Sequence, residues 1–175
     1  MAIKTIFLDR DGVINKEVHY LHKIEDFEFI DGVFKICQYL NMLGYKIIVI
    51  TNQSGISRGY YNETDFEILS NWMVDEFKKN DIKILDIFHC PHLPDSNCKC
   101  RKPKPGMLLA AKDKYNIDMQ NSWLIGDKED DIIAAKNSDI TNTILVKSGH
   151  KINEIDSHAK YILESINETN QVIIN

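Results

Sequence analysis

The chain has 175 residues, of which 43% are hydrophobic, so we expect residues 1–175 to form a single domain around one core. The 26 acidic and 21 basic residues give a net charge of -5 without a basic tract, which argues against nonspecific nucleic-acid binding. No apolar run approaches the roughly 20 residues that span a bilayer, and Met1–Thr5 leads into the first predicted strand without the segments of a signal peptide, so we expect a soluble cytoplasmic protein.

The first predicted element is a short buried strand over the apolar run Ile3–Leu8, and it ends in Asp9-Arg10-Asp11-Gly12. Two carboxylates this close repel each other unless a cation lies between them, so the pair indicates a Mg²⁺ site. Asp9 could attack phosphorus while Asp11 protonates the leaving oxygen and then activates water, although the charge pattern alone permits the reverse. The alternative is an ordinary turn, for which Asp-x-Asp-Gly is also typical.

The second predicted strand, Lys46–Ile50, also ends in a small polar loop. Before it we expect an irregular flap over Lys16–Ile30, and then a helix that begins at Asp31-Gly32 and ends at Gly44. The loop Thr51–Gly55 can point a hydroxyl and several backbone N–H groups at a phosphate. By itself this loop also fits a turn followed by a helix cap.

The rest of the chain alternates between strands and helices. We expect Thr64 and Asp65 to cap a helix that runs to Lys79. Further strands are predicted at Ile84–His89, Ser122–Ile125, Thr143–Val146 and Tyr161–Leu163, and further helices at Met107–Tyr115, Asp130–Asn137 and over the last dozen residues. This alternation predicts an α/β fold, a doubly wound, Rossmann-like parallel sheet with helices on both faces. Ligands bind such sheets beyond the carboxyl ends of the strands, where the polar loops fall.

A loop after the third predicted strand contains four candidate metal ligands. Cys90, His92, Cys98 and Cys100 lie within eleven residues, which suits a closed, structural zinc site better than two disulfides. We therefore expect a zinc loop over residues 90–100, inserted after that strand. The one-residue gaps are tighter than the usual ligand spacing, and the alternatives are reduced, unliganded thiols or His89 as a weaker ligand.

Six short blocks, taken together, are specific to one group of enzymes. They are Leu8–Gly12, Phe27–Gly32, Thr51–Ile56, Cys90–His92, Cys98–Pro103 and Gly126–Lys128. On these blocks the chain resembles haloacid-dehalogenase-type phosphatases, and more narrowly the family of D-glycero-D-manno-heptose 1,7-bisphosphate 7-phosphatases and histidinol phosphatases. The resemblance runs from near the first residue to about Gly149. Relatives of this type carry zinc on the cysteine loop.

The resemblance implies a role for each residue of the predicted site. Asp9 would be the nucleophile that forms an aspartyl-phosphate, and Asp11 the general acid and base. Mg²⁺ would be held by the Asp9 carboxylate, the Asp11 backbone carbonyl and the Asp127 carboxylate. Thr51 and Lys102 would stabilise the phosphoryl oxygens.

The acidic run after the fourth predicted strand offers several carboxylates to a metal. Asp127 is chosen as the ligand because it follows the strand immediately. Asp130 and Asp131 are typical of the first turn of a helix, where a negative charge favours the helix dipole. Lys128 would either contact the phosphate or pair with an acid.

The resemblance also implies where the substrate binds. The expected contacts are Glu17, Val18, His19, Tyr20, Thr51, Asn52, Gln53, Ser54, Arg101, Lys102 and Lys128. Arg101 could bind a second phosphate through two parallel hydrogen bonds, which suits a bisphosphate. The flap reads Val18-His19-Tyr20, where the family has a His-Gly-Tyr pattern.

These observations predict a Mg²⁺-dependent phosphatase that removes the C7 phosphate of the heptose bisphosphate and carries a structural zinc ion. Its partner would be a small phosphorylated sugar, and we expect a monomer. One alternative is a histidinol-phosphate phosphatase, which shares both metal sites. The other is a noncatalytic metal-bound protein that keeps the fold, although the full set of Asp9, Asp11, Thr51, Lys102 and Asp127 argues against it.

Overall fold

The computed structural model describes residues 2–174. Within these residues, six strands form one parallel sheet in the order β3-β2-β1-β4-β5-β6. The strands are β1 (Thr5–Leu8), β2 (Lys46–Asn52), β3 (Ile84–Cys90), β4 (Trp123–Gly126), β5 (Asn142–Val146) and β6 (Tyr161–Leu163). Phe7 of β1 pairs with Ile48 on one side and with Leu124 on the other. The strand order reverses at β1, so a crevice is expected beyond the carboxyl ends of β1 and its neighbours.

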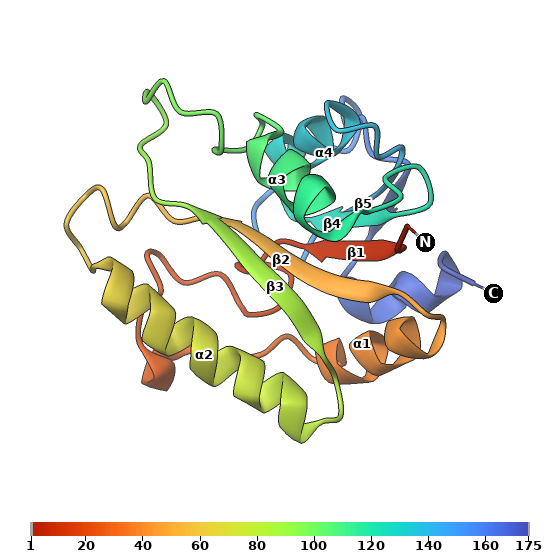
Figure 1. Cartoon of the computed structure of the whole chain (residues 1–175), viewed down its shortest axis with the longest axis horizontal. Helices are drawn as coiled ribbons and strands as arrows, with labels where there is room; N and C mark the ends of the chain where they lie inside the picture. Colours follow the sequence, from red (N-terminus) through yellow and green to blue (C-terminus); the bar gives the residue numbers. More distant parts are fainter. Residues whose placement is uncertain (1, 175) are drawn as a thin grey trace.

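Helices cover both faces of the sheet (Figure 1). One face packs against α1 (Val33–Met42), α2 (Glu63–Lys79) and the 3-10 helix η2 (Ile166–Gln171), and the other against α3 (Gly106–Tyr115) and α4 (Glu129–Lys136). Successive residues of a strand point to opposite faces, so Ile6 and Leu8 join the first core while Phe7 joins the second. The predicted Rossmann-like sheet is therefore confirmed.

Some predicted boundaries and caps were wrong. Helix α2 is capped by Asn62, whose side chain accepts a hydrogen bond from Asp65 N–H at 3.0 Å while the Asp65 carboxylate accepts one from Asn62 N–H at 2.9 Å. Thr64 lies inside the first turn because this reciprocal capping box satisfies the free N–H groups one step earlier. Residues Ile166–Gln171 form a 3-10 helix where a longer helix was predicted over the last dozen residues, of which residue 175 lies outside the described residues.

The flap Lys16–Ile30 is irregular, as predicted, but it is tied down at both ends. Lys16 N–H donates to Glu28 O at 2.8 Å, and Ile30 N–H donates to Ile14 O at 2.9 Å. A short 3-10 helix, η1 (Ile24–Asp26), lies between these contacts. Across the described residues, no helix combines the length and the apolar character needed to cross a membrane.

Candidate active site

Three carboxylates and one lysine meet where the strands β1, β2 and β4 end. Asp9 follows β1, Asp127 follows β4, and Asp131 lies in the first turn of α4, with at most 7% of any of these residues exposed. Their ligand atoms lie within 4.8 Å of one another. Lys102 Nζ lies 3.0 Å from Asp9 Oδ1 and 2.5 Å from Asp131 Oδ1. We call these four residues the carboxylate cluster.

Lys102 is held in place by the end of β2. Its backbone N–H donates to Asn52 Oδ1 at 3.1 Å, and the Asn52 side chain donates back to Lys102 O at 3.1 Å. The Lys102 ammonium also donates to Ile50 O at 3.1 Å. Burial opposes the charged form of Lys102, but the neighbouring Asp131 and Asp9 outweigh it and raise the pKa. Lys102 is therefore a fixed positive charge against Asp9.

The charges of the carboxylate cluster do not balance, because its three acids face one lysine, which pairs with Asp9 and Asp131 but not with Asp127 among the described residues. Burial, partly offset by Lys102, raises the pKa of Asp9 to about 6, and burial also raises the pKa of Asp127 and Asp131. Asp127 Oδ1 is buried and has no hydrogen-bond partner among the described residues. Such closely spaced oxygen ligands with excess negative charge fit a hard divalent cation such as Mg²⁺.

Asp11 lies outside the carboxylate cluster, in a hydrogen-bond network of its own. Its Oδ1 accepts hydrogen bonds from Arg10 Nη2 at 2.9 Å and from Asn15 Nδ2 at 3.0 Å. Its Oδ2 accepts one from Gln53 Nε2 at 3.0 Å, and the same amide donates to Thr51 Oγ1 at 2.7 Å. The two acids of the first loop therefore have different surroundings: Asp9 faces a lysine and two buried acids, whereas Asp11 faces neutral amides and an arginine.

A cavity of about 200 Å³ lies between the flap and the acids Asp9, Asp11 and Asp131, all of which line it. Its lining includes every predicted substrate contact except Thr51, together with residues that the sequence analysis did not select. The predicted residues among them are Glu17, Val18, His19, Tyr20, Asn52, Gln53, Ser54, Arg101, Lys102 and Lys128. Thr51 is 1% exposed, and its hydroxyl accepts the hydrogen bond from Gln53. Asp127 lies among the buried residues and not in the cavity lining.

Sequence reasoning did not select two residues that lie beside Asp127, namely Asp131 and His150. Asp131 was interpreted as a helix-dipole residue, and this was incomplete, because the side chain is buried against Lys102. The signal available was the spacing of Asp127 and Asp131, since residues four apart can share one side of a helical turn. The sequence analysis did not select His150 as a site residue, and its ring donates to Asp127 Oδ2 at 2.6 Å. No sequence spacing indicates that contact.

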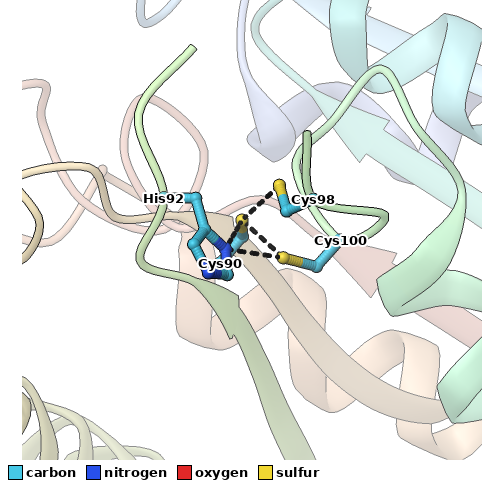
Figure 2. A group of neighbouring side chains, drawn as sticks. All are labelled: Cys90, His92, Cys98 and Cys100. Atoms are coloured by element: carbon cyan, nitrogen blue, oxygen red, sulfur yellow. Dashed lines mark hydrogen bonds between the residues drawn. The ribbon is translucent and has the colours of Figure 1, made fainter. Parts of the chain in front are cut away.

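The four predicted zinc ligands lie together, as Figure 2 shows. Cys100 Sγ lies 2.7 Å from Cys90 Sγ, and His92 Nδ1 lies 3.3 Å from Cys90 Sγ and 3.2 Å from Cys100 Sγ. Cys98 Sγ is 3.7 Å from Cys90 Sγ. We call these four residues the thiol cluster. His89 lies apart from it, with Nε2 2.8 Å from Glu63 Oε2.

The thiol cluster has the donor set that zinc prefers, three sulfurs and one imidazole nitrogen. Burial raises the pKa of Cys90. Burial also opposes ionisation of Cys98, but hydrogen bonds from Ser96 Oγ at 3.2 Å, from the Arg101 backbone and from the neighbouring thiols together outweigh it and lower the pKa to about 6. Because four donors converge, the set leaves no position open for substrate, which is the arrangement of a structural site.

Known proteins are similar to this chain over nearly its whole length. The family model described as HAD-hyrolase-like matches residues 99–169. The D-glycero-alpha-D-manno-heptose-1,7-bisphosphate 7-phosphatase of Campylobacter jejuni is 51% identical over 167 residues, which cover 95% of this chain and 96% of the relative. The D-glycero-beta-D-manno-heptose-1,7-bisphosphate 7-phosphatase of Escherichia coli K12 is 41% identical over 180 residues, with coverages of 98% and 94%.

The same likeness extends to solved structures. The crystal structure of D,D-heptose 1.7-bisphosphate phosphatase from B. bronchiseptica, complexed with magnesium and phosphate, has a TM-score of 0.85 to this chain. Its sequence is 26% identical, and the alignment covers 97% of both chains.

Proposed function

Because this chain belongs to the heptose-1,7-bisphosphate 7-phosphatase family of haloacid-dehalogenase-type phosphatases, we propose that it hydrolyses the C7 phosphate monoester of D-glycero-D-manno-heptose 1,7-bisphosphate. The observation that carries the proposal is the buried contact of Asp9 with Lys102 at 3.0 Å, beneath a cavity of about 200 Å³. An acid and a fixed positive charge in contact are what phosphoryl transfer to a carboxylate needs. The relatives named for heptose do not favour the histidinol-phosphate alternative.

Asp9 is the nucleophile in this proposal. Its Oδ1 accepts hydrogen bonds from Arg10 N–H at 2.8 Å and from Lys102 Nζ at 3.0 Å, which leaves Oδ2 to attack phosphorus. The new bond from Asp9 to phosphorus forms as the bond from phosphorus to the sugar oxygen breaks. Lys102 stabilises the negative charge of the phosphoryl oxygens during this step. Thr51 accepts a hydrogen bond from Gln53 and thereby holds the Gln53 side chain in the loop after β2.

Asp11 serves as the acid and then as the base. It gives its proton to the departing sugar oxygen and then takes a proton from water. The water oxygen attacks phosphorus, the bond to Asp9 breaks, and inorganic phosphate leaves. Gln53, Asn15 and Arg10 hold the Asp11 carboxylate beside the cavity, where it can reach the leaving oxygen.

The cation that we propose for this reaction is Mg²⁺, held by the carboxylates of Asp9 and Asp127 and by the backbone carbonyl of Asp11. The partnerless Asp127 Oδ1 is the best-matched ligand atom. When bound, the ion would offset the negative charge of the phosphate against these acids.

A structural zinc ion on the thiol cluster completes the proposed site. Arg101 and Lys102 follow Cys100 directly, so whatever orders that loop also places both basic residues. Arg101 lines the cavity and reaches back to donate to His92 O at 3.2 Å. We assign it to the second phosphate of the substrate. Zinc would therefore act on substrate positioning, and take no part in the chemistry.

For the anomer, we propose a preference for the alpha form. Two relatives named for the alpha anomer are 51% and 50% identical to this chain, against 44% and 41% for two relatives named for the beta anomer.

The test is phosphate release from both anomers of the heptose bisphosphate, from heptose 1-phosphate and from histidinol phosphate, with metal content measured on the same sample. We expect the largest kcat/KM for the alpha bisphosphate, heptose 1-phosphate as its product by ³¹P NMR, and loss of the reaction on chelation with recovery on adding Mg²⁺. A higher kcat/KM for histidinol phosphate, or release of the C1 phosphate, would refute the proposed function. A preference for the beta anomer would refute only the anomer assignment.

A further inference from the structure

One oxygen of Asp127 is fully engaged by the loop after β5. Asp127 Oδ2 accepts a hydrogen bond from His150 N–H at 2.9 Å and a second from His150 Nδ1 at 2.6 Å. A carboxylate oxygen can only accept, so the ring contributes an Nδ1–H donor. A single residue thus binds the same oxygen through its backbone and its side chain.

Two glycines close around the same oxygen. A Cβ atom at Gly149 or at Gly12 would overlap the Asp127 carboxylate, and in both cases the nearest atom is Oδ2. Ser148 Oγ donates to Gly12 O at 2.7 Å, which joins the loop after β5 to the loop of Asp9 and Asp11. Oδ2 therefore already has two hydrogen-bond donors and lies against the backbone of two glycines. Oδ1 is the atom that remains, without a hydrogen-bond partner among residues 2–174.

We propose that His150 is a positioning residue that fixes the rotation of the Asp127 carboxylate, so that Oδ1 and not Oδ2 is presented to the divalent cation. The inference rests on the proposed function only in taking Asp127 as a ligand of that cation. The backbone N–H of His150 remains in any variant, so the side chain contributes the second of two restraints. A hydrogen bond to a ligating carboxylate orients it and typically changes metal affinity 10- to 100-fold.

The His150 ring also reaches the substrate flap. Its Nε2 lies 3.8 Å from Glu17 Oε1, and both side chains line the cavity. The ring therefore stands between the buried ligand and the flap, with 37% of the side chain exposed. A substitution at His150 leaves the packed core intact, because the ring fills the edge of a cavity.

The chain contains its own control for this arrangement. His158 binds Glu129 Oε1 in the same way, through its backbone N–H at 2.8 Å and its Nδ1 at 2.8 Å. This second pair lies at the surface, where the His158 side chain is 62% exposed. His158→Ala therefore removes the same type of hydrogen bond from a carboxylate that belongs to neither cluster.

The experiment measures Mg²⁺ binding to the full-length, metal-stripped protein by isothermal titration calorimetry, without substrate, for wild type, His150→Ala, His150→Asn and His158→Ala. We expect His150→Ala to weaken Mg²⁺ binding by about 10-fold, within the range for lost outer hydrogen bonds. His150→Asn should recover most of it, because its amide can donate near the position of Nδ1, and His158→Ala should match wild type. In turnover assays, the Mg²⁺ concentration that gives half-maximal rate should rise in His150→Ala. The fold-change in this concentration, relative to wild type, should exceed the fold-change in kcat at saturating Mg²⁺.

Equal Mg²⁺ affinity for wild type and His150→Ala would overturn the inference, as would equal weakening in His158→Ala or no recovery in His150→Asn. Should His150→Ala fail to fold, the comparison of His150→Gln with His150→Asn decides, because only the shorter amide keeps the donor near Nδ1. Wild type that binds Mg²⁺ but releases no phosphate from the heptose bisphosphate refutes the proposed function and leaves this inference standing.

Discussion

The carboxylate cluster and the thiol cluster both bring candidate metal ligands together, but they differ in how far apart their members lie in the sequence. Asp9, Lys102 and Asp127 of the carboxylate cluster are far apart in sequence, and they are brought together by buried strands. Asp131 lies four residues after Asp127, in the first turn of α4. The thiol cluster lies within eleven residues, from Cys90 at the end of β3 to Cys100 on the loop before α3. The first cluster is organised by the core and needs a cation for charge balance. The second has little core of its own, so a cation would supply the organisation. Removal of the two proposed metal ions should therefore have different consequences.

The largest effect is expected for Asp9→Asn, which separates chemistry from folding in the carboxylate cluster. The amide cannot serve as nucleophile, so kcat should fall by at least about 10⁴-fold. The fold should survive, because burial already raises the pKa of Asp9 to about 6 and the neutral amide avoids that cost. Phosphate release and thermal unfolding measure the two quantities. A variant with more than a hundredth of the wild-type rate would exclude Asp9 as nucleophile.

Asp131→Asn tests whether the residue that sequence reasoning missed supports Lys102. The substitution weakens the 2.5 Å contact with Lys102 Nζ, which then retains Asp9 as its charged partner. Because Lys102 would be less well fixed against the phosphoryl oxygens, we expect kcat to fall by about 10²-fold with little change in KM. The neighbouring Asp130→Asn is the matched control and should have a much smaller effect. Equal losses in both variants would mean that Asp131 acts through net charge alone.

The thiol cluster is tested by Cys98→Ser and by Cys37→Ala, since Cys37 is buried on α1 outside both clusters. Cys98→Ser should lose zinc, lower the melting temperature by several degrees and raise KM for the bisphosphate about 10-fold, because Arg101 and Lys102 follow the loop. Cys37→Ala should keep its zinc. Stripping Mg²⁺ from the wild type should abolish turnover with a smaller shift in melting temperature. If zinc content and KM are unchanged in Cys98→Ser, the cluster does not organise the site.

The smallest effect is expected for Glu17→Gln, which tests how much the buried negative charge of Glu17 reduces the stability of the folded protein. Burial first, and then the charge of Asp11, raise the pKa of Glu17 from 4.5 to about 7. Between these values the folded chain holds a proton that the unfolded chain releases, so this group's contribution to stability is present below pH 4.5 and is lost as the pH rises through 7. Glu17→Gln should match wild type near pH 4. Above pH 7 it should be more stable by about 1–2 kcal/mol, a value reduced from the full shift because the side chain is 27% exposed.

Urea unfolding of the Mg²⁺-free protein from pH 4 to pH 8 measures this difference. Glu25→Gln, on the exposed 3-10 turn of the same flap, reports the effect of losing a flap charge away from the cavity. If the free energy of unfolding changes with pH in the same way for Glu17→Gln and wild type, ionisation of Glu17 does not destabilise the fold.

The sequence by itself determined the alternation of strands and helices, the polar loops that follow the strands, and the two sets of ligand types. These features are local: an apolar run, a turn residue or a cysteine spacing is visible within a few positions of the chain. The α/β sheet and the meeting of Asp9 and Asp127 at its edge followed from such signals, because parallel strands end at a common edge, whereas Lys102 was assigned from the family resemblance.

Only the tertiary structure decided which atoms of these residues face one another. The burial of Asp131 against Lys102, the reciprocal bonds of Asn52 with Lys102, and the closure of His150 over Asp127 join segments that no periodicity relates. The physical reason is that a hydrogen bond depends on distances of a few tenths of an ångström. Those distances are set by how helices and loops pack on the sheet, and not by the order of residues along any one of them.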